Sequence, residues 1–201
     1  MEQVAKAGVE TILSFLLETR VSVESVRLDP ANQQMELVGF TVLNPKGFDE
    51  TQSVFAAQRV LVQADPLVLF SPRAVVRHIE LEGANVFAEA RLGRGFNLKK
   101  LLDSVNRFKA PRPANEKRWI LERGVLNNFS IRFNSDFPPK RFDYAGESLE
   151  MSMRGPHDEG VTADKIIAEF LSMLINECEK GTQNRLGQTL SEILNMGRRA
   201  Q

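Results

Sequence analysis

Most of the chain between residues 20 and 154 alternates apolar with polar residues, the pattern of strands that bury one face. Two runs show this most clearly, with apolar residues at Phe129, Ile131 and Phe133, and at Leu149, Met151 and Met153. Because successive side chains of a strand point to opposite faces, a sheet of such strands has one apolar and one polar face. The apolar face must be covered, and this requirement constrains the rest of the chain.

Two irregularities interrupt the strand patterns. The alternation slips by one residue between Val23 and Val26, which indicates a β-bulge. A short apolar-acidic string that ends in glycine also recurs, at Met35 to Gly39, Ile79 to Gly83 and Ile120 to Gly124. This echo indicates either a repeated strand-pair unit or a chance similarity of short strings.

Helical patterns lie at both ends of the chain and before its middle. Residues 4–17 have an amphipathic pattern with Val4, Gly8, Ile12 and Phe15 on one apolar stripe. A second helix is expected over Asn97 to Val105, with Asn97 as its cap.

A third helix is expected after Thr162, which can cap it. Gly181 interrupts its apolar stripe, and a further stripe follows at residues 186–194. We therefore predict one α+β domain over residues 1–180 and a helical extension over 181–201. The domain should hold a strongly twisted, mostly antiparallel sheet of about seven to nine strands. The amphipathic N- and C-terminal helices should cover the apolar face of that sheet.

Composition excludes some classes of partner. The 26 basic residues balance 26 acidic ones, so we expect no nucleic-acid partner. The single cysteine, Cys178, lies on an apolar helical stripe and is expected to be a small buried hydrophobe. The sequence shows neither an apolar run of about 20 residues nor a secretory signal.

Candidate catalytic residues are few. The two histidines, His78 and His157, lie in a strand pattern and in a polar turn, where structural roles outweigh catalysis or cation binding. Two pairs of carboxylates occur, Glu80 with Glu82 and Glu147 with Glu150. Their positions favour a solvated polar strand face over general acid–base catalysis. No zinc, phosphate-loop or dinucleotide motif occurs. We therefore expect a non-enzymatic protein that requires no cofactor and no metal.

The stretch GFTVLNPKGF reads as a strand that ends in a tight turn, formed by Asn44, Pro45, Gly47 and Phe48. Its neighbours follow in a characteristic order: a helix before it, then an apolar-Ser segment at Leu67 to Ser71, an I-x-L-x-G-x-x-V strand at Ile79 to Val86, and a helix with Asn-Leu-x-x-Leu-Leu at Asn97 to Leu102. In this order and spacing, residues 5–178 resemble short relatives of the bacterial AsmA-like envelope proteins, which are distant kin of chorein-type lipid-transfer proteins.

The resemblance implies a cell-envelope module that handles lipid, or maintains the outer membrane, through an apolar sheet surface. It also implies a periplasmic location and an N-terminal membrane anchor, which this sequence does not include; a cytoplasmic location is the alternative. The expected partner is a lipid or a membrane surface.

Two physical alternatives stay open beside this interpretation. The chain's own helices can fill the apolar groove, because five or six buried side chains at about 1.5–3 kcal/mol each compete with an acyl chain. Four methionines, at positions 35, 151, 153 and 173, can line an adaptable cleft or simply fill the core. The rival function is a structural or assembly module, which binds a protein partner or itself through a sheet edge or the C-terminal helix.

Overall fold

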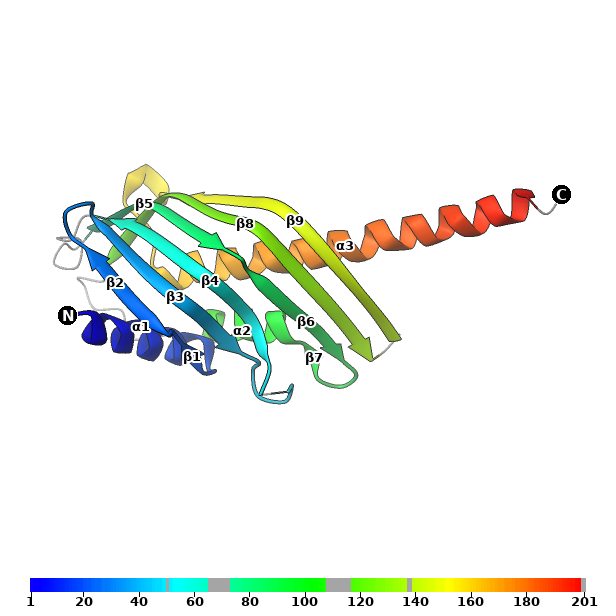
Figure 1. Cartoon of the computed structure of the whole chain (residues 1–201), viewed down its shortest axis with the longest axis horizontal. Helices are drawn as coiled ribbons and strands as arrows, with labels where there is room; N and C mark the ends of the chain where they lie inside the picture. Colours follow the sequence, from blue (N-terminus) through cyan, green and yellow to red (C-terminus); the bar gives the residue numbers. More distant parts are fainter. Residues whose placement is uncertain (50, 65–72, 108–116, 137–138, 200–201) are drawn as a thin grey trace.

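A computed structural model describes residues 1–49, 51–64, 73–107, 117–136 and 139–199, with side chains described as far as residue 181. It contains nine strands and three α-helices (Figure 1). The elements are α1 (Glu2–Leu17), β1 (Val21–Ser22), β2 (Ser25–Asp29), β3 (Gln34–Leu43), β4 (Ser53–Ala64), β5 (Arg73–Glu82), β6 (Asn85–Arg91), β7 (Gly95–Phe96), α2 (Asn97–Arg107), β8 (Arg118–Asp136), β9 (Pro139–Met153) and α3 (Ala163–Arg199).

All nine strands belong to one sheet. Most neighbours are antiparallel, but β5 and β6 both run parallel to β8. These two strands lie end to end between β4 and β8, because β5 pairs with one half of β8 and β6 with the other. The predicted α+β class, with a mostly antiparallel sheet and terminal helices, is confirmed.

One inserted residue in each long strand forms a crease across the sheet. In β8, Leu126 and Phe129 are both buried although they are three residues apart, and Asn128 between them has a φ of 48°. In a regular strand, residues three apart lie on opposite faces. The extra residue therefore shifts the alternation by one, and Glu147 of β9 matches it, so the register between β8 and β9 does not shift here.

The same shift occurs at matching register positions in the neighbouring strands. In β3, Val38 and Phe40 both pair with residues of β4, but Gly39 between them does not. The φ of Gly39 is 65°. Gly83 joins β5 to β6 with a φ of 61°. We call this row the crease; its members are Glu24, Gly39, Gln58, Gly83, Asn128 and Glu147.

Glycine is required at two crease positions for two reasons. A φ near +60° is costly for residues with a Cβ. The side chain of the adjacent strand also lies over each glycine. A Cβ on Gly39 would lie 2.4 Å from Cδ of Glu24, and a Cβ on Gly83 would lie 2.6 Å from Cδ of Gln58. Two of the three glycines in the sequence echo thus mark the crease, whereas Gly124 lies away from it in β8.

The two faces of the sheet differ in polarity. On the inner face, the register aligns apolar residues across the sheet, as in the row Val26, Leu37, Val60, Leu81, Leu126 and Leu149. The outer face carries ion pairs between strands. Arg59 is central to them, with Nε 2.5 Å from Oε1 of Glu36 and Nη1 3.3 Å from Oε1 of Glu82.

Helix α1 covers one edge of the sheet in an orientation that the sequence pattern did not predict. The predicted core stripe is largely exposed, with Val4 77% and Phe15 67% accessible. The polar side faces the edge instead: the amide of Val23 donates to Oε1 of Glu10 at 2.8 Å, and that of Val21 donates to Oγ of Ser14 at 2.9 Å. These bonds satisfy backbone groups of the edge strands, and this gain outweighs burial of the apolar stripe.

Helix α3 runs along the inner face and continues past the sheet (Figure 1). The helix continues through Gly181, where the apolar stripe is interrupted, and runs from Ala163 to Arg199. Gly181 is buried against β9, where an added Cβ would lie 3.2 Å from Cε2 of Phe142. The small residue therefore allows the helix to approach the strand closely. The expected cap is not formed, since the buried hydroxyl of Thr162 has no hydrogen-bond partner among the described residues.

The crease generates a first prediction. Substitution Gly83→Ala should lower the free energy of unfolding by about 1–3 kcal/mol, because it adds a Cβ at positive φ and displaces Gln58. The double variant Gly83→Ala with Gln58→Ala should recover only the part of the lost stability that is due to the clash with Gln58. The matched control is Gly8→Ala in α1, where a Cβ meets nothing within 4 Å; it should be neutral or stabilise by up to about 1 kcal/mol. Urea denaturation measures all three, and an unchanged Gly83→Ala would contradict the strain.

Cys178 provides a second prediction. It is 3% exposed, as expected for a buried hydrophobe, and burial together with Glu177 and Glu179 raises the pKa of its thiol from 9.0 to about 12. Only the thiolate reacts with a disulfide reagent. At pH 8 the folded protein should therefore react about a thousandfold more slowly than the chain unfolded in urea. Equal rates in the two states would show that the thiol is accessible.

The same shift predicts a pH dependence. The unfolded thiol loses its proton near pH 9, whereas the folded thiol keeps it up to about pH 12. The unfolded state thus binds fewer protons in this window, and stability should fall as the pH rises above 9. The variant Cys178→Ala, measured over the same pH range, should lack this contribution.

Candidate functional site

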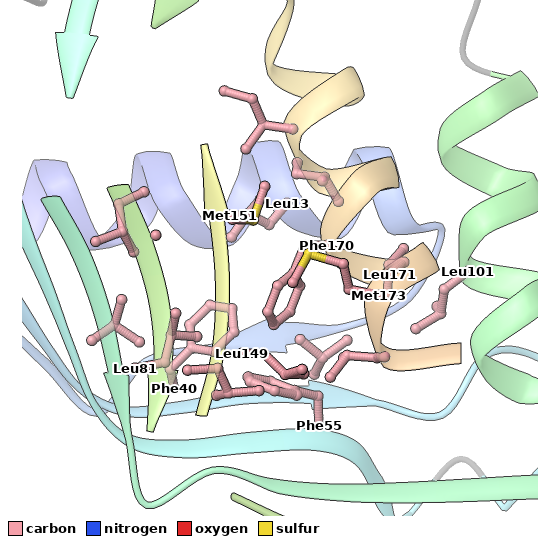
Figure 2. A pocket seen from close by; sticks show the side chains of 18 of the residues that line it. Leu13, Phe40, Phe55, Leu81, Leu101, Leu149, Met151, Phe170, Leu171 and Met173 are labelled. Atoms are coloured by element: carbon pink, nitrogen blue, oxygen red, sulfur yellow. The ribbon is translucent and has the colours of Figure 1, made fainter. Parts of the chain in front are cut away.

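The most prominent apolar feature is a cavity between the inner face of the sheet and the helices. Its volume is about 240 Å³, and its described lining residues are all apolar or glycine. They come from all three helices and from β3, β4, β5, β8 and β9. Figure 2 shows Phe170 and Met173 of α3 on one side, with Phe55 and Leu149 of the sheet on the other.

The cavity spans the crease, with Leu37 of β3 lining it on one side and Phe40 of the same strand on the other. Phe170 reaches from α3 toward the sheet and meets Phe55 of β4 edge to face, with ring centroids 5.7 Å apart. Leu171 and Leu174 of the same helix are buried in the core. The helix thus covers the apolar face only in part, and the groove is not completely filled by the chain itself.

The cavity reaches the surface along one side. Leu149 and Met151 of β9 line it and are only half-buried, as are Ile166 and Met173 of α3. A closed void of this volume would cost about 6 kcal/mol at about 24 cal/mol per Å³, which is comparable to the stability of a whole domain. An opening to solvent lowers that cost and also gives a ligand a path to the cavity.

The six candidate apolar residues fall into two groups. Leu149 and Met151 line the cavity, whereas Met153 is half-buried beside Leu121 at the end of the sheet. Phe129 and Ile131 are buried across the crease, and Phe133 is half-buried there and stacks on Phe142 with centroids 4.9 Å apart. All six lie on the inner face, but only two contribute to the cavity.

Most lining residues were missed as site residues by the sequence reasoning. Leu81 and Phe40 come from strands whose alternation was visible. Phe170, Leu171 and Leu174 belong to the apolar stripe of α3, which the pattern did predict. The sequence pattern therefore indicated which residues are buried. It does not distinguish a buried residue that lines a cavity from one that fills the core.

The turn formed by Asn44, Pro45, Gly47 and Phe48 has a structural role. Asn44 is 1% exposed, and its Oδ1 accepts a hydrogen bond from Nδ2 of Asn97 at 2.8 Å. Phe48 is buried, and Gly47 has a φ of 98°. The turn is therefore hydrogen-bonded to the start of α2 and holds the end of β3 beside this helix.

Asn97 organises this junction from the helix side. Its Oδ1 accepts from the amides of Leu98 and Glu89 at 2.8 and 2.9 Å, and its Nδ2 also donates to the carbonyl of Phe87 at 2.7 Å. The side chain thus binds the amide of the next residue, where a regular N-cap binds the second or third helical amide, and it also satisfies polar groups of the turn and of β6. The two asparagines fix α2 against the sheet and place Leu98 and Leu101 at the cavity.

The candidate catalytic groups lie apart from the cavity. Nε2 of His78 is 3.6 Å from Oε2 of Glu80, whose other oxygen accepts from Asn127 at 2.8 Å. Glu82 and Glu150 each pair with an arginine, and His157 lies exposed in the turn before α3. Among the described residues, no three His, Cys, Asp or Glu side chains are grouped as a metal site. Within the same part of the chain, no helix has the length and hydrophobicity that a bilayer crossing requires.

No protein-family model matches the chain, and no curated protein does either.

Proposed function

We propose that this protein is a non-enzymatic module that binds the end of an acyl chain, or a similar apolar group, in the cavity between its sheet and helices. The observation that carries the proposal is the uniformly apolar lining of a cavity of about 240 Å³ that reaches the surface. Its described lining residues include no nucleophile, base or charged group, so they favour binding over chemistry.

The volume limits what the cavity can hold. An apolar cavity of about 150 Å³ binds benzene, so about 240 Å³ corresponds to roughly ten carbon atoms. Sites for drug-sized ligands measure about 300–1,000 Å³, which makes this cavity too small for a whole lipid. It fits part of one acyl chain.

The binding free energy expected for this cavity favours a ligand that binds reversibly. Burial of about ten methylene groups contributes roughly 8 kcal/mol at about 0.8 kcal/mol each. Association costs about 4 kcal/mol or more in lost freedom, so the net affinity is modest. A protein that passes lipid on, or senses it, requires such reversible binding.

The AsmA-like resemblance is consistent with this proposal. The order of helix, strand pair, Asn-Pro turn and later strands led us to expect a curved sheet with an apolar inner face. On that basis we place the protein in the cell envelope, in lipid handling or outer-membrane homeostasis. The lipid or membrane surface would then be its partner.

A matched pair of tryptophan variants tests the cavity. The wild-type protein should bind the fluorescent probe N-phenyl-1-naphthylamine, and decanoic acid should displace it. Leu149→Trp, which fills the cavity, should weaken probe binding about tenfold or more. Leu92→Trp makes the same change at a residue that is 73% exposed, and it should bind as the wild type does.

Controls separate occupancy from misfolding. Thermal unfolding of both variants shows whether the sheet tolerates the larger side chain, and Met151→Phe is a milder filling variant if Leu149→Trp is unstable. Failure of the wild type to bind the probe, or equal binding by all variants, would refute the proposal. Native mass spectrometry of the purified protein adds a direct search for a retained lipid.

A second candidate function is assembly. Helix α3 projects beyond the sheet toward the C-terminus (Figure 1), and in this part the sequence repeats apolar residues at helical spacing: Leu186, Leu190, Ile193 and Leu194. At the sheet edge, β9 pairs only with β8 among the described strands, whereas α1 covers the opposite edge. Either feature can bind a protein partner or a second copy.

Light scattering coupled to size-exclusion chromatography tests assembly through the helix. If the stripe mediates self-association, Leu190→Glu should reduce the mass to that of one chain, 22.6 kDa. Ser191→Glu adds the same charge outside the stripe and should leave the mass unchanged. A wild-type protein that is already monomeric at high concentration would eliminate self-assembly as the function.

A further inference from the structure

The outer face of the sheet holds a second, polar cleft, on the opposite side from the cavity. Its volume is about 480 Å³, and its floor is formed by β6, β8 and β9. Asp49 and Gln52, from the segment that joins β3 to β4, lie at its side. The cleft is therefore built from well-paired strands as well as from a connecting segment.

Strand register fixes the arrangement of the floor. Glu89 of β6 lies beside Asn134 of β8, which lies beside Arg141 of β9. The next row consists of Phe87, Arg132 and Asp143. The cleft thus presents two acidic groups, Glu89 and Asp143, and two guanidinium groups, Arg132 and Arg141, within two adjacent rows.

Glu89 is the unusual member of this floor. It is only 3% exposed although it belongs to the polar face. Its Oε1 accepts from Nε of Arg91 at 2.8 Å, and this bond raises the pKa of Arg91. Its Oε2 is buried and has no hydrogen-bond partner among the described residues. A buried carboxylate oxygen in this state is costly, so it calls for a donor that the described part of the chain does not provide.

The charges of the cleft indicate the type of ligand. Three arginines, at 91, 132 and 141, face three carboxylates, at 49, 89 and 143. Nε of Arg132 lies 3.2 Å from Oδ1 of Asp143. A cleft with balanced charge does not attract a polyanion or a polycation. It matches a ligand that carries both signs.

We propose that this cleft binds a small zwitterion, in which a primary ammonium group donates to Oε2 of Glu89 and an acidic group is held by Arg141 and Arg132. A phosphoethanolamine group has this chemistry, either as the free compound or as a lipid headgroup. The site is independent of the apolar cavity, because the two lie on opposite faces of the sheet.

Isothermal titration calorimetry with two soluble probes tests the contact with Glu89. Phosphoethanolamine should bind, whereas phosphocholine, which has no N–H donor, should bind about tenfold more weakly or not at all. Glu89→Gln keeps the shape of the side chain and should weaken phosphoethanolamine binding about tenfold. The matched control, Glu147→Gln on exposed β9, should leave it unchanged.

Vesicles distinguish the two sources of the ligand. Co-sedimentation with vesicles of phosphatidylcholine that contain phosphatidylethanolamine, but not with phosphatidylcholine alone, would assign a lipid headgroup. Binding of the soluble compound without vesicle binding would assign a free zwitterion.

Other outcomes would overturn the proposal. Equal binding of phosphoethanolamine and phosphocholine would exclude a hydrogen bond to Glu89, and absence of binding in every arm would mean that water alone satisfies Oε2. If Glu89→Gln is unstable in thermal unfolding, Arg141→Gln provides a second test on an exposed residue and should weaken binding about tenfold. Leu149→Trp should not affect this binding, so failure of the cavity and failure of the cleft are separable.

Discussion

The crease is the constraint on which the rest of the structure depends. A single inserted residue would disrupt one strand, because it moves every later side chain to the wrong face. Here the neighbouring strands carry the insertion at the same register position, at Gly39 in β3, Gly83 between β5 and β6, and Asn128 in β8. The inner face therefore stays apolar on both sides of the row. Because the row crosses the neighbouring strands at the same place, these strands bend together and the sheet curves as a whole (Figure 1).

Curvature changes how the helices can cover the sheet. A straight helix such as α3 contacts a concave surface closely only over part of its length, and Gly181 supplies one close approach at Phe142. Helix α1 does not contribute its most apolar stripe to the inner face, because Glu10 and Ser14 bind the backbone of the edge strands. The apolar surface left between these contacts is the cavity. It is thus a consequence of sheet shape and edge protection together.

Local sequence patterns predicted the strands and helices, but not how the strands pair or how the helices are oriented. Alternation revealed the two faces, and the glycine echo marked two crease positions. The bulge expected between Val23 and Val26 is not formed, because β1 and β2 pair with β3 in one continuous register; the phase slip falls on the crease at Glu24. That these irregularities align is a property of strand pairing, which no single stretch of sequence contains. The orientation of α1 was missed because hydrophobic periodicity gives no weight to side chains that bond a strand edge. Glu89 was missed for a related reason, since in the sequence it is one more polar residue on a polar face.

The crease also separates two kinds of packing, and the cavity crosses it, with Phe40 and Phe55 lining the cavity on the aromatic side. Beyond the crease the inner face is aromatic: Phe129 packs on Tyr144 with ring centroids 6.3 Å apart, Phe133 stacks on Phe142, and Phe129 covers Gly146 so closely that a Cβ there would lie 2.0 Å from its ring. On the other side the aligned rows are aliphatic, as at Leu81 and Leu149. Rings fill the space beneath a curved sheet, whereas shorter branched side chains leave part of it open. The sequence thus places most of its aromatic bulk on one half of a bent surface, and the cavity extends mainly under the aliphatic half.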